Sequence, residues 1–189
     1  MALDSESRWR LVRKAKSKPV EPEGDVIVRP ATEDDMVWLV DIYNYYVQNS
    51  VVTFDLEPLQ HKDWVEKYRW LKSLELPFVV AASPNGQILG FAYVAPWRQK
   101  AAYRRTVEDS IYLRPAATGK RLGTKLLAEL IDKSKAAGVK EIVAVISDKG
   151  AESSIKLHER FGFKHQGHLG KVGFKFGRWL GTVLMQKSL

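Results

Sequence analysis

A loop that could bind phosphate stands in the middle of the chain, between a β-rich run and an amphipathic pattern. It covers residues 116–124 and holds two glycines and the adjacent cations Lys120 and Arg121. Leucines then recur at the i, i+4, i+8 spacing of one helix face, from Leu122 to Leu130. A glycine-containing loop that enters a helix presents free N–H groups and the positive end of the helix dipole. We therefore expect an anion site here, suited above all to phosphate.

The glycine spacing narrows the choice of phosphate ligand. Gly119 and Gly123 lie four residues apart and no Gly-Lys-Ser/Thr follows them, so the P-loop pattern is absent. The dinucleotide pattern G-x-G-x-x-G is absent too. Taken alone, the segment could also be a basic strand, turn and helix without a ligand.

Acid–base chemistry could come from His158, because an imidazole titrates near neutral pH and can donate a proton or a hydrogen bond. A lone histidine on a helix can equally be a packed or surface residue. The other histidines, His61, His165 and His168, stand in no motif, and the four show no metal spacing, so we expect no metal. The absence of cysteine excludes disulfides, thiolate metal sites and a cysteine acyl-enzyme.

The composition is that of one globular domain. With 189 residues, 45% hydrophobic and 28% charged, the chain is large enough to bury a hydrophobic core without the help of disulfides or bound metals. No apolar run approaches the roughly 18–20 residues of a membrane span. The net charge of +8 could attract nucleic acid, a membrane or a small polyanion, or could be only a solvated basic surface.

The first 24 residues differ from the rest. They hold six Lys/Arg against four Asp/Glu, few large apolar residues, and a linker with Pro19, Pro22 and Gly24. We expect residues 1–24 to form a basic, disordered tail in front of a single domain at residues 25–189.

Hydrophobic periodicity and turn residues predict the order β-α-α-β-β-β-α-β-α-β-β. Ser83-Pro84-Asn85-Gly86 predicts a hairpin turn, and 51–54 a brief extended piece. Strands are expected at 26–28, 78–82, 88–94, 107–113, 141–146, 164–172 and 180–186, and helices at 36–48, 62–74, from 122 to Gly138, and 151–161.

The loop and this order together resemble the GNAT superfamily of N-acetyltransferases. Its acyl-CoA pyrophosphate loop has the pattern R/Q-x-x-G-x-G/A, which falls here on residues 118–123. Thr118 stands where Arg or Gln is usual, and Arg121 replaces the central glycine. The resemblance implies the GNAT fold, an α/β (α+β) architecture in which about four helices flank a mixed sheet of about seven strands.

Four blocks of the sequence carry a closer resemblance: Pro96-Trp97-Arg98, Ala102-Tyr103-Arg104-Arg105-Thr106-Val107-Glu108-Asp109-Ser110-Ile111-Tyr112, Lys156-Leu157-His158-Glu159-Arg160-Phe161-Gly162-Phe163 and Val172-Gly173-Phe174-Lys175-Phe176-Gly177-Arg178-Trp179. Within that superfamily they make the chain most similar to the phosphinothricin N-acetyltransferase-like group, over about residues 26–187. The similarity implies that Glu108 is the general base, directly or through water; the alternative is a strand glutamate paired with Arg104 or Arg105.

The same resemblance gives a role to His158, and the alternation of side chains along a strand gives one to Asp109. His158 stands where many members have a tyrosine that protonates the leaving thiolate, so it is the second catalytic candidate. Asp109 follows Glu108 directly and points to the opposite face of the strand, so we expect a structural role for it.

The resemblance further implies an acetyl-CoA site. The backbone of Ile111, Tyr112 and Leu113 would hold the pantetheine in a β-like ladder. An asparagine commonly starts the helix after the fifth strand, but Ala151 is found there, so Ser153 or Ser154 would have to substitute. The pyrophosphate would lie on Thr118, Gly119, Lys120, Arg121, Leu122, Gly123 and Thr124.

Four residues are candidates for the acceptor amine: Phe54, Trp97, Arg98 and Tyr103. Arginine offers a bidentate fork to the carboxylate of an amino acid, and aromatic neighbours can bury its side chain. The alternative is that Trp97 and Tyr103 belong to the core or the rim and that Arg98 is solvated. Phe174, Phe176 and Trp179 are expected in the core or in a dimer contact.

We therefore predict an acetyl-CoA-dependent N-acetyltransferase for the α-amino group of a small amino-acid analogue, of the phosphinothricin or methionine sulfoximine/sulfone type. Transfer would be direct, in a cytoplasmic homodimer without metal, nucleic acid or membrane. The alternatives are an acetyltransferase for protein or peptide amines and a CoA-binding sensor or interaction module without turnover. The departures at Thr118, Arg121 and Ala151 keep the second alternative open.

Overall fold

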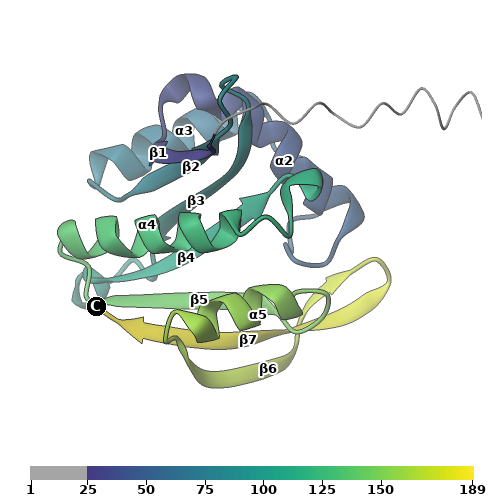
Figure 1. Ribbon diagram of the computed structural model, residues 1–189. Helices are drawn as coiled ribbons and strands as arrows, with labels where there is room; N and C mark the ends of the chain where they lie inside the picture. The colour runs from purple at the N-terminus through teal and green to yellow at the C-terminus, as the bar shows by residue number, and fades with distance from the viewer. Residues whose placement is uncertain (1–24) are drawn as a thin grey trace, which may run out of the picture.

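A seven-stranded sheet runs through the computed structural model, which describes residues 25–189 (Figure 1). The strand order is β1-β2-β3-β4-β5-β7-β6, and all neighbours are antiparallel except β4 and β5. The expected tail at 1–24 lies outside the described residues. The strands are β1 (Ile27–Pro30), β2 (Phe78–Ala82), β3 (Ile88–Pro96), β4 (Thr106–Leu113), β5 (Glu141–Ser147), β6 (Lys164–Lys175) and β7 (Arg178–Ser188).

Two helices cover each face of the sheet. On one face lie α2 (Met36–Asn49) and α3 (His61–Ser73), and on the other α4 (Leu122–Ala136) and α5 (Glu152–Arg160) (Figure 1). Because successive strand residues point to opposite faces, β2 sends Phe78 and Val80 to the first core and Val79 and Ala81 to the second. Among residues 25–189, no helix combines the length and apolar character that crossing a membrane requires.

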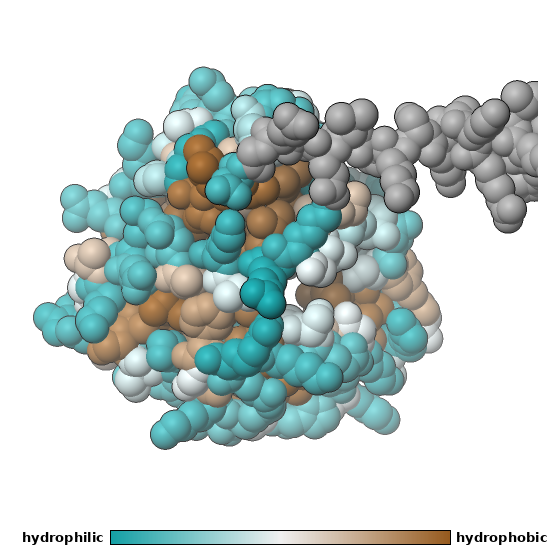
Figure 2. Space-filling view, viewed as in Figure 1, coloured by the Kyte–Doolittle hydropathy of each residue, from teal (hydrophilic) through white to brown (hydrophobic). Residues whose placement is uncertain are grey.

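The α4/α5 face is mostly polar on its outside. Figure 2 shows hydrophilic side chains over most of this face, with apolar groups gathered in a few places between them. The leucines of α4 predicted to face inward, Leu122, Leu126 and Leu130, are all buried. The helix is therefore amphipathic in the sense that its spacing indicated.

The predicted order of elements is confirmed, with corrections at two places. β6 and β7 run farther than expected because Phe176 and Gly177, with φ of 51° and 71°, form a tight turn that lets pairing continue to Lys175 and Arg178. The extended piece expected at 51–54 is not a strand; residues 51–53 form bends, and none of the four residues pairs with a strand of the described sheet.

The hairpin of β6 and β7 is joined to the loop between α2 and α3. Lys175 is buried, and its Nζ donates a hydrogen bond of 2.9 Å to the carbonyl oxygen of Thr53. The expectation of a core position for Phe174, Phe176 and Trp179 is wrong, since each is more than half exposed. We call these three residues, with Leu169 and Val172, the hairpin apolar surface.

The sheet opens between β4 and β5, and we call this opening the fork. The two parallel strands pair only from Thr106↔Glu141 to Glu108↔Val143. Beyond that point β4 continues to Leu113, whereas β5 continues to Ser147 and pairs only with β7. The side of β4 that faces β5 therefore has no strand partner from Asp109 onward.

Candidate active site

The predicted phosphate loop leads from the end of β4 into α4. The helix begins at Leu122, and its N-cap residue, Arg121, makes no side-chain hydrogen bond to the first turn. The first N–H groups of any α-helix lack intrahelical partners. This helix terminus can therefore offer them, together with the positive end of the dipole, to an anion.

The loop reaches this position through two left-handed residues. Gly119 has φ of 79° and Arg121 has φ of 60°. Arginine thus adopts at 121 the conformation that glycine takes easily, at a cost of about 1 kcal/mol. The departure from the family pattern at this position changes the residue but keeps a glycine-like backbone.

The fork lies beside this loop and contains the predicted pantetheine strand. Ile111, Tyr112 and Leu113 form the end of β4 that pairs with β3 but not with β5. Gly123 of α4 packs close to Leu113 and to Leu157 of α5. The uncapped helix and the open strand edge are near each other because α4 follows β4 directly. These groups fit acetyl-CoA, whose pyrophosphate needs N–H donors and whose pantetheine amides need backbone partners.

Glu108 stands at the last pair before the fork, half-buried. Its side chain shares a face with Tyr112, which packs against the α2/α3 core. Burial and the charge of Asp109 raise the pKa of Glu108, whereas Arg98 and Lys67 act in the opposite direction. A carboxylate with a raised pKa holds a proton more tightly than an ordinary glutamate, which suits a general base.

His158 lies on the other face of the sheet and contacts Asp109. Its Nε2 is 2.9 Å from Asp109 Oδ2, and its Nδ1 is 2.8 Å from the carbonyl oxygen of Ser154. Burial opposes the charged ring, but the attraction and hydrogen bond of Asp109 and the bond to Ser154 raise the pKa of His158 overall. Both ring nitrogens are thus engaged inside the protein.

The α5 residues expected to contact CoA lie at the start of this helix. Ala151 is the N-cap residue, buried and without a polar side chain to offer. Ser153 is exposed, whereas Ser154 is partly buried with its Oγ 3.4 Å from His158 Nδ1.

The four acceptor candidates fall into two places. Trp97, Arg98 and Tyr103 belong to the connection between β3 and β4, where the Arg98 guanidinium lies 4.8 Å from the centre of the Trp97 ring. Arg98 is also close enough for its charge to act on Glu108. Tyr103 is 42% exposed, and Phe54 lies in the α2–α3 loop with its ring against Gly173 of β6.

Sequence reasoning missed two groups around these candidates. Lys67 of α3, whose Nζ donates to Tyr93 Oη at 3.2 Å, acts on Glu108. Near Phe54 in the sequence, the Tyr43 hydroxyl donates a 2.6 Å hydrogen bond to Asp55 and lies 2.8 Å from the Thr53 hydroxyl. The carbonyl oxygen of Thr53 is the one that accepts the hydrogen bond of Lys175. No sequence signal pairs these residues, because each contact joins separate elements.

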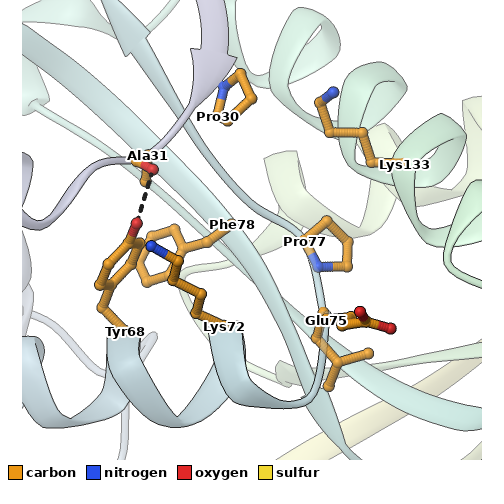
Figure 3. Close-up of a pocket in the computed structure, with 9 residues that line it drawn as sticks. Pro30, Ala31, Tyr68, Lys72, Glu75, Pro77, Phe78 and Lys133 are labelled. Carbon is orange, nitrogen blue, oxygen red and sulfur yellow. Dashed lines mark hydrogen bonds between the residues drawn. The ribbon is translucent and has the colours of Figure 1, made fainter.

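A separate cleft lies at the far end of α4 (Figure 3). It has a volume of about 270 Å³ and lies between Lys72 and Glu75, near the end of α3, and Lys133 of α4. Lys133 is 11 residues from Leu122, so about 16 Å separate it along the helix from the phosphate loop. This cleft contains none of the predicted site residues.

Comparison with known families and proteins gives this arrangement its identity. The model of the acetyltransferase (GNAT) family matches residues 39–163, a span that includes the fork, the loop and the start of α5. The chain belongs to the GNAT acetyltransferase family.

Individual GNAT relatives are similar over most of the chain. A phosphinothricin N-acetyltransferase of Alcaligenes faecalis is 36% identical over 86% of this chain and 82% of the relative. An L-methionine sulfoximine/L-methionine sulfone acetyltransferase of Pseudomonas aeruginosa is 36% identical over 86% of this chain and 94% of the relative. A solved phosphinothricin acetyltransferase from Sinorhizobium meliloti, in complex with acetyl-CoA, has a TM-score of 0.83 and 39% identity, over 87% of this chain and 88% of that one.

These comparisons confirm the predicted family, the GNAT fold and an acetyl-CoA-dependent N-acetyltransferase. They do not favour the alternative of a CoA-binding module without turnover, because the relatives are enzymes by name. Within residues 25–189, no group of three or more His, Cys, Asp and Glu side chains is placed to hold a metal ion.

Proposed function

We propose that the chain acetylates the α-amino group of a small amino-acid analogue, of the phosphinothricin or methionine sulfoximine/sulfone type. The observation that carries the proposal is a pair of opposite charges: Glu108 is half-buried on β4, and Arg98, exposed on the β3–β4 connection, is close enough for its charge to act on Glu108. An amino-acid acceptor is a zwitterion, so its ammonium and carboxylate complement these two groups. The names of the relatives support this acceptor class.

In this proposal Glu108 is the general base. The acceptor ammonium must lose a proton before its nitrogen can attack, and the carboxylate with the raised pKa accepts that proton directly or through a water. Arg98 holds the acceptor carboxylate, with Trp97 and Tyr103 beside it on the β3–β4 connection, and Phe54 contributes an aromatic surface from the α2–α3 loop. Bound acetyl-CoA would supply an activated thioester, which the freed amine attacks without an acyl-enzyme.

The proposed acetyl-CoA site follows the fork and the loop. Backbone groups of Ile111, Tyr112 and Leu113 pair with the pantetheine. Ser154 stands in for the asparagine that Ala151 replaces. The pyrophosphate is held by the loop and the first turn of α4, through Thr118, Gly119, Lys120, Arg121, Leu122, Gly123 and Thr124.

The predicted role of His158 as the acid for the leaving thiolate stays a prediction. With 2% exposure and both ring nitrogens bonded, His158 would have to leave Asp109 or Ser154 to give up a proton. We keep it outside the proposed transfer step.

The test is acetyl-CoA-dependent release of CoA with methionine sulfone as the acceptor. N-acetylmethionine sulfone, in which the amine is blocked, serves as the control and should release no CoA. Faster release with peptide amines than with methionine sulfone would favour the alternative that acts on protein or peptide amines. Release from neither kind of acceptor would overturn the proposal.

We also propose a homodimer, in which a second copy covers the hairpin apolar surface. Five large apolar side chains from 48% to 58% exposed lie on one hairpin, and such gatherings mark contact sites. Light scattering after gel filtration should give twice the mass of the chain, and Phe174→Lys with Trp179→Lys should give the monomer. A parent protein that stays monomeric at micromolar concentration would contradict the dimer.

We propose a cytoplasmic location because acetyl-CoA, which the reaction consumes, is made and kept inside cells. Fractionation of cells that express the chain should recover it with the cytoplasm, and recovery with membranes or medium would contradict the proposal.

A further inference from the structure

A buried ion pair crosses the fork next to the proposed base. His158 Nε2 and Asp109 Oδ2 are 2.9 Å apart, and the two side chains are 2% and 1% exposed. His158 belongs to α5, which follows β5, whereas Asp109 is the first residue of β4 beyond the last pair with β5. The contact therefore joins the two arms of the fork where they separate.

The partner of the other ring nitrogen determines the protonation of the pair. Nδ1 lies 2.8 Å from the Ser154 carbonyl oxygen, which can only accept a hydrogen bond. Nδ1 therefore carries a hydrogen, and Nε2 either donates to an ionised Asp109 or accepts from a protonated one. In both cases the two side chains share one proton and have no net charge.

Asp109 depends on this partner. Within the part of the chain that the structure describes, its Oδ1 is buried without a hydrogen-bond partner. The edge of the Phe163 ring, at 4.8 Å between centroids, packs against His158 and supplies no charge. Without the imidazole, Asp109 would be a buried, unpaired carboxylate, which is costly and which repels other anions.

We propose that His158 is a positioning residue that neutralises Asp109, so that Glu108 works beside a neutral pair instead of beside a second buried anion. This inference rests on the proposed role of Glu108 as the general base. Glu108 follows Val107 and precedes Asp109 on β4, and its other charged neighbours are Arg98, from the β3–β4 connection, and Lys67, from α3. Burial and Asp109 raise the pKa of Glu108, and the two cations lower it.

The experiment compares the parent protein with H158Q, D109N and D109N/H158Q. The carboxyl titration of Glu108 is followed by ¹³C NMR, with the signal assigned from its loss in E108Q, and kcat/KM for the acceptor is measured against pH. In H158Q, Asp109 and Glu108 should titrate as a coupled pair whose last proton leaves about one pH unit higher than in the parent. Below that pH, kcat/KM should fall about tenfold, because only the ionised base accepts a proton.

The double variant separates neutralisation from proton donation. D109N/H158Q has two neutral amides in place of the pair. The acid limb of its profile of kcat/KM against pH should therefore return to the parent pH, and most of the lost kcat/KM should recover. D109N alone should move the limb to no higher pH than in the parent, because it removes the charge of Asp109 that raises the pKa of Glu108. A double variant as slow as H158Q at every pH would make the imidazole a participant in the chemistry and overturn the proposal, as would an unshifted limb in H158Q.

Two further readouts keep the test decisive. If H158Q does not fold, the ¹⁵N signals of His158 in the parent protein decide. Protons retained through pH 8 support the pair, and a ring that titrates freely at about pH 6.5 excludes it. If the parent acetylates no amine at all, the proposed function fails, yet the Glu108 titration still tests the pair without any turnover.

Discussion

The proposed chemistry of this site depends on two neighbouring carboxylates that strand geometry sends to opposite faces of one sheet. Glu108 faces the α2/α3 side with Arg98 and Lys67, whereas Asp109 is buried on the α4/α5 side with His158. Two side chains with the same carboxylate group therefore have different environments one position apart. One carboxylate is left half-open to an acceptor, and the other is paired.

Glu108→Gln should lower kcat by about 10²–10⁴-fold at neutral pH, the usual worth of general base catalysis. The amide keeps the size and hydrogen bonding of the side chain but cannot take the ammonium proton. Raising the pH should partly rescue the variant, because more of the amine is then free. Glu66→Gln, at an exposed position of α3, is the control; a near-normal kcat for Glu108→Gln would remove Glu108 from the mechanism.

Arg98→Ala should raise KM for an amino-acid acceptor much more than KM for acetyl-CoA, since a charged hydrogen bond of roughly 1.5–3 kcal/mol is lost. Arg98 lowers the pKa of Glu108, so its removal should also move the acid limb of kcat/KM to higher pH. Steady-state kinetics across pH, with the exposed Arg104→Ala as the control, measure both effects. Equal changes in the two KM values would contradict an acceptor-side role.

The stability that His158 contributes should depend on pH with a definite sign. Its pKa is raised in the folded protein, so the contribution is complete below the ordinary histidine pKa and is lost as pH rises through the folded value. Above about pH 7, where an unfolded histidine is neutral and the folded ring begins to lose its proton, urea unfolding of the parent and of H158Q should show their difference shrinking as the pH increases. A difference that grows with pH would show that the ring is buried neutral.

Among the elements, the fork and the β6–β7 hairpin decide where a substrate could lie. The fork exists because β5 leaves β4 after Val143 while it stays paired with β7. The hairpin contacts the α2–α3 loop at two residues. Lys175 donates a hydrogen bond to the carbonyl oxygen of Thr53, and Gly173, which has no side chain, leaves room for the ring of Phe54. The position of Phe54 thus depends on an element more than a hundred residues away.

Lys175→Met should lower the free energy of unfolding by about 1–2 kcal/mol, because the Thr53 carbonyl loses a charged donor. Burial already lowers the pKa of this lysine against the attraction of Asp55, so the relief of desolvation offsets part of the loss. KM for the acceptor should rise as the α2–α3 loop loosens around Phe54.

Lys171→Met is the matched control, since Lys171 lies on the same strand but is exposed. Denaturant unfolding and acceptor kinetics of both variants provide the comparison. Identical behaviour of the two would show that the Lys175 contact contributes nothing to the loop.

In the whole molecule, the sheet with helices on both faces carries the proposed acetyl-CoA site at the fork. Acetyl-CoA at about 100 times its Kd should stabilise the fold by about 2.7 kcal/mol. For a chain of this size the thermal midpoint should rise by about 5–10 °C. S-acetyl-N-acetylcysteamine, which has the thioester but no pyrophosphate, is the control and should shift the midpoint little. A midpoint that does not move in millimolar acetyl-CoA would contradict the proposal that the loop binds its pyrophosphate.

Local patterns predicted the order of the elements and the turn that leads from β4 into α4. The leucine spacing from Leu122 to Leu130 predicted α4, and the turn at 83–86 predicted the β2–β3 hairpin, because both depend on neighbours a few residues apart. The alternation that separates Glu108 from Asp109 is equally local. Family resemblance, carried by short blocks such as Thr106–Ser110, then predicted the fold and the enzyme class.

The partners of the site residues could be found only in the folded chain. His158 contacts Asp109, 49 residues away in the sequence, and Lys175 contacts Thr53, 122 residues away. Lys67 of α3 lowers the pKa of Glu108, which lies on β4. A pKa and an ion pair depend on distance and burial in space, and no periodicity along the chain records which distant side chains meet. The sequence could therefore nominate His158 as an acid, while only the tertiary structure revealed that both of its ring nitrogens are already bonded.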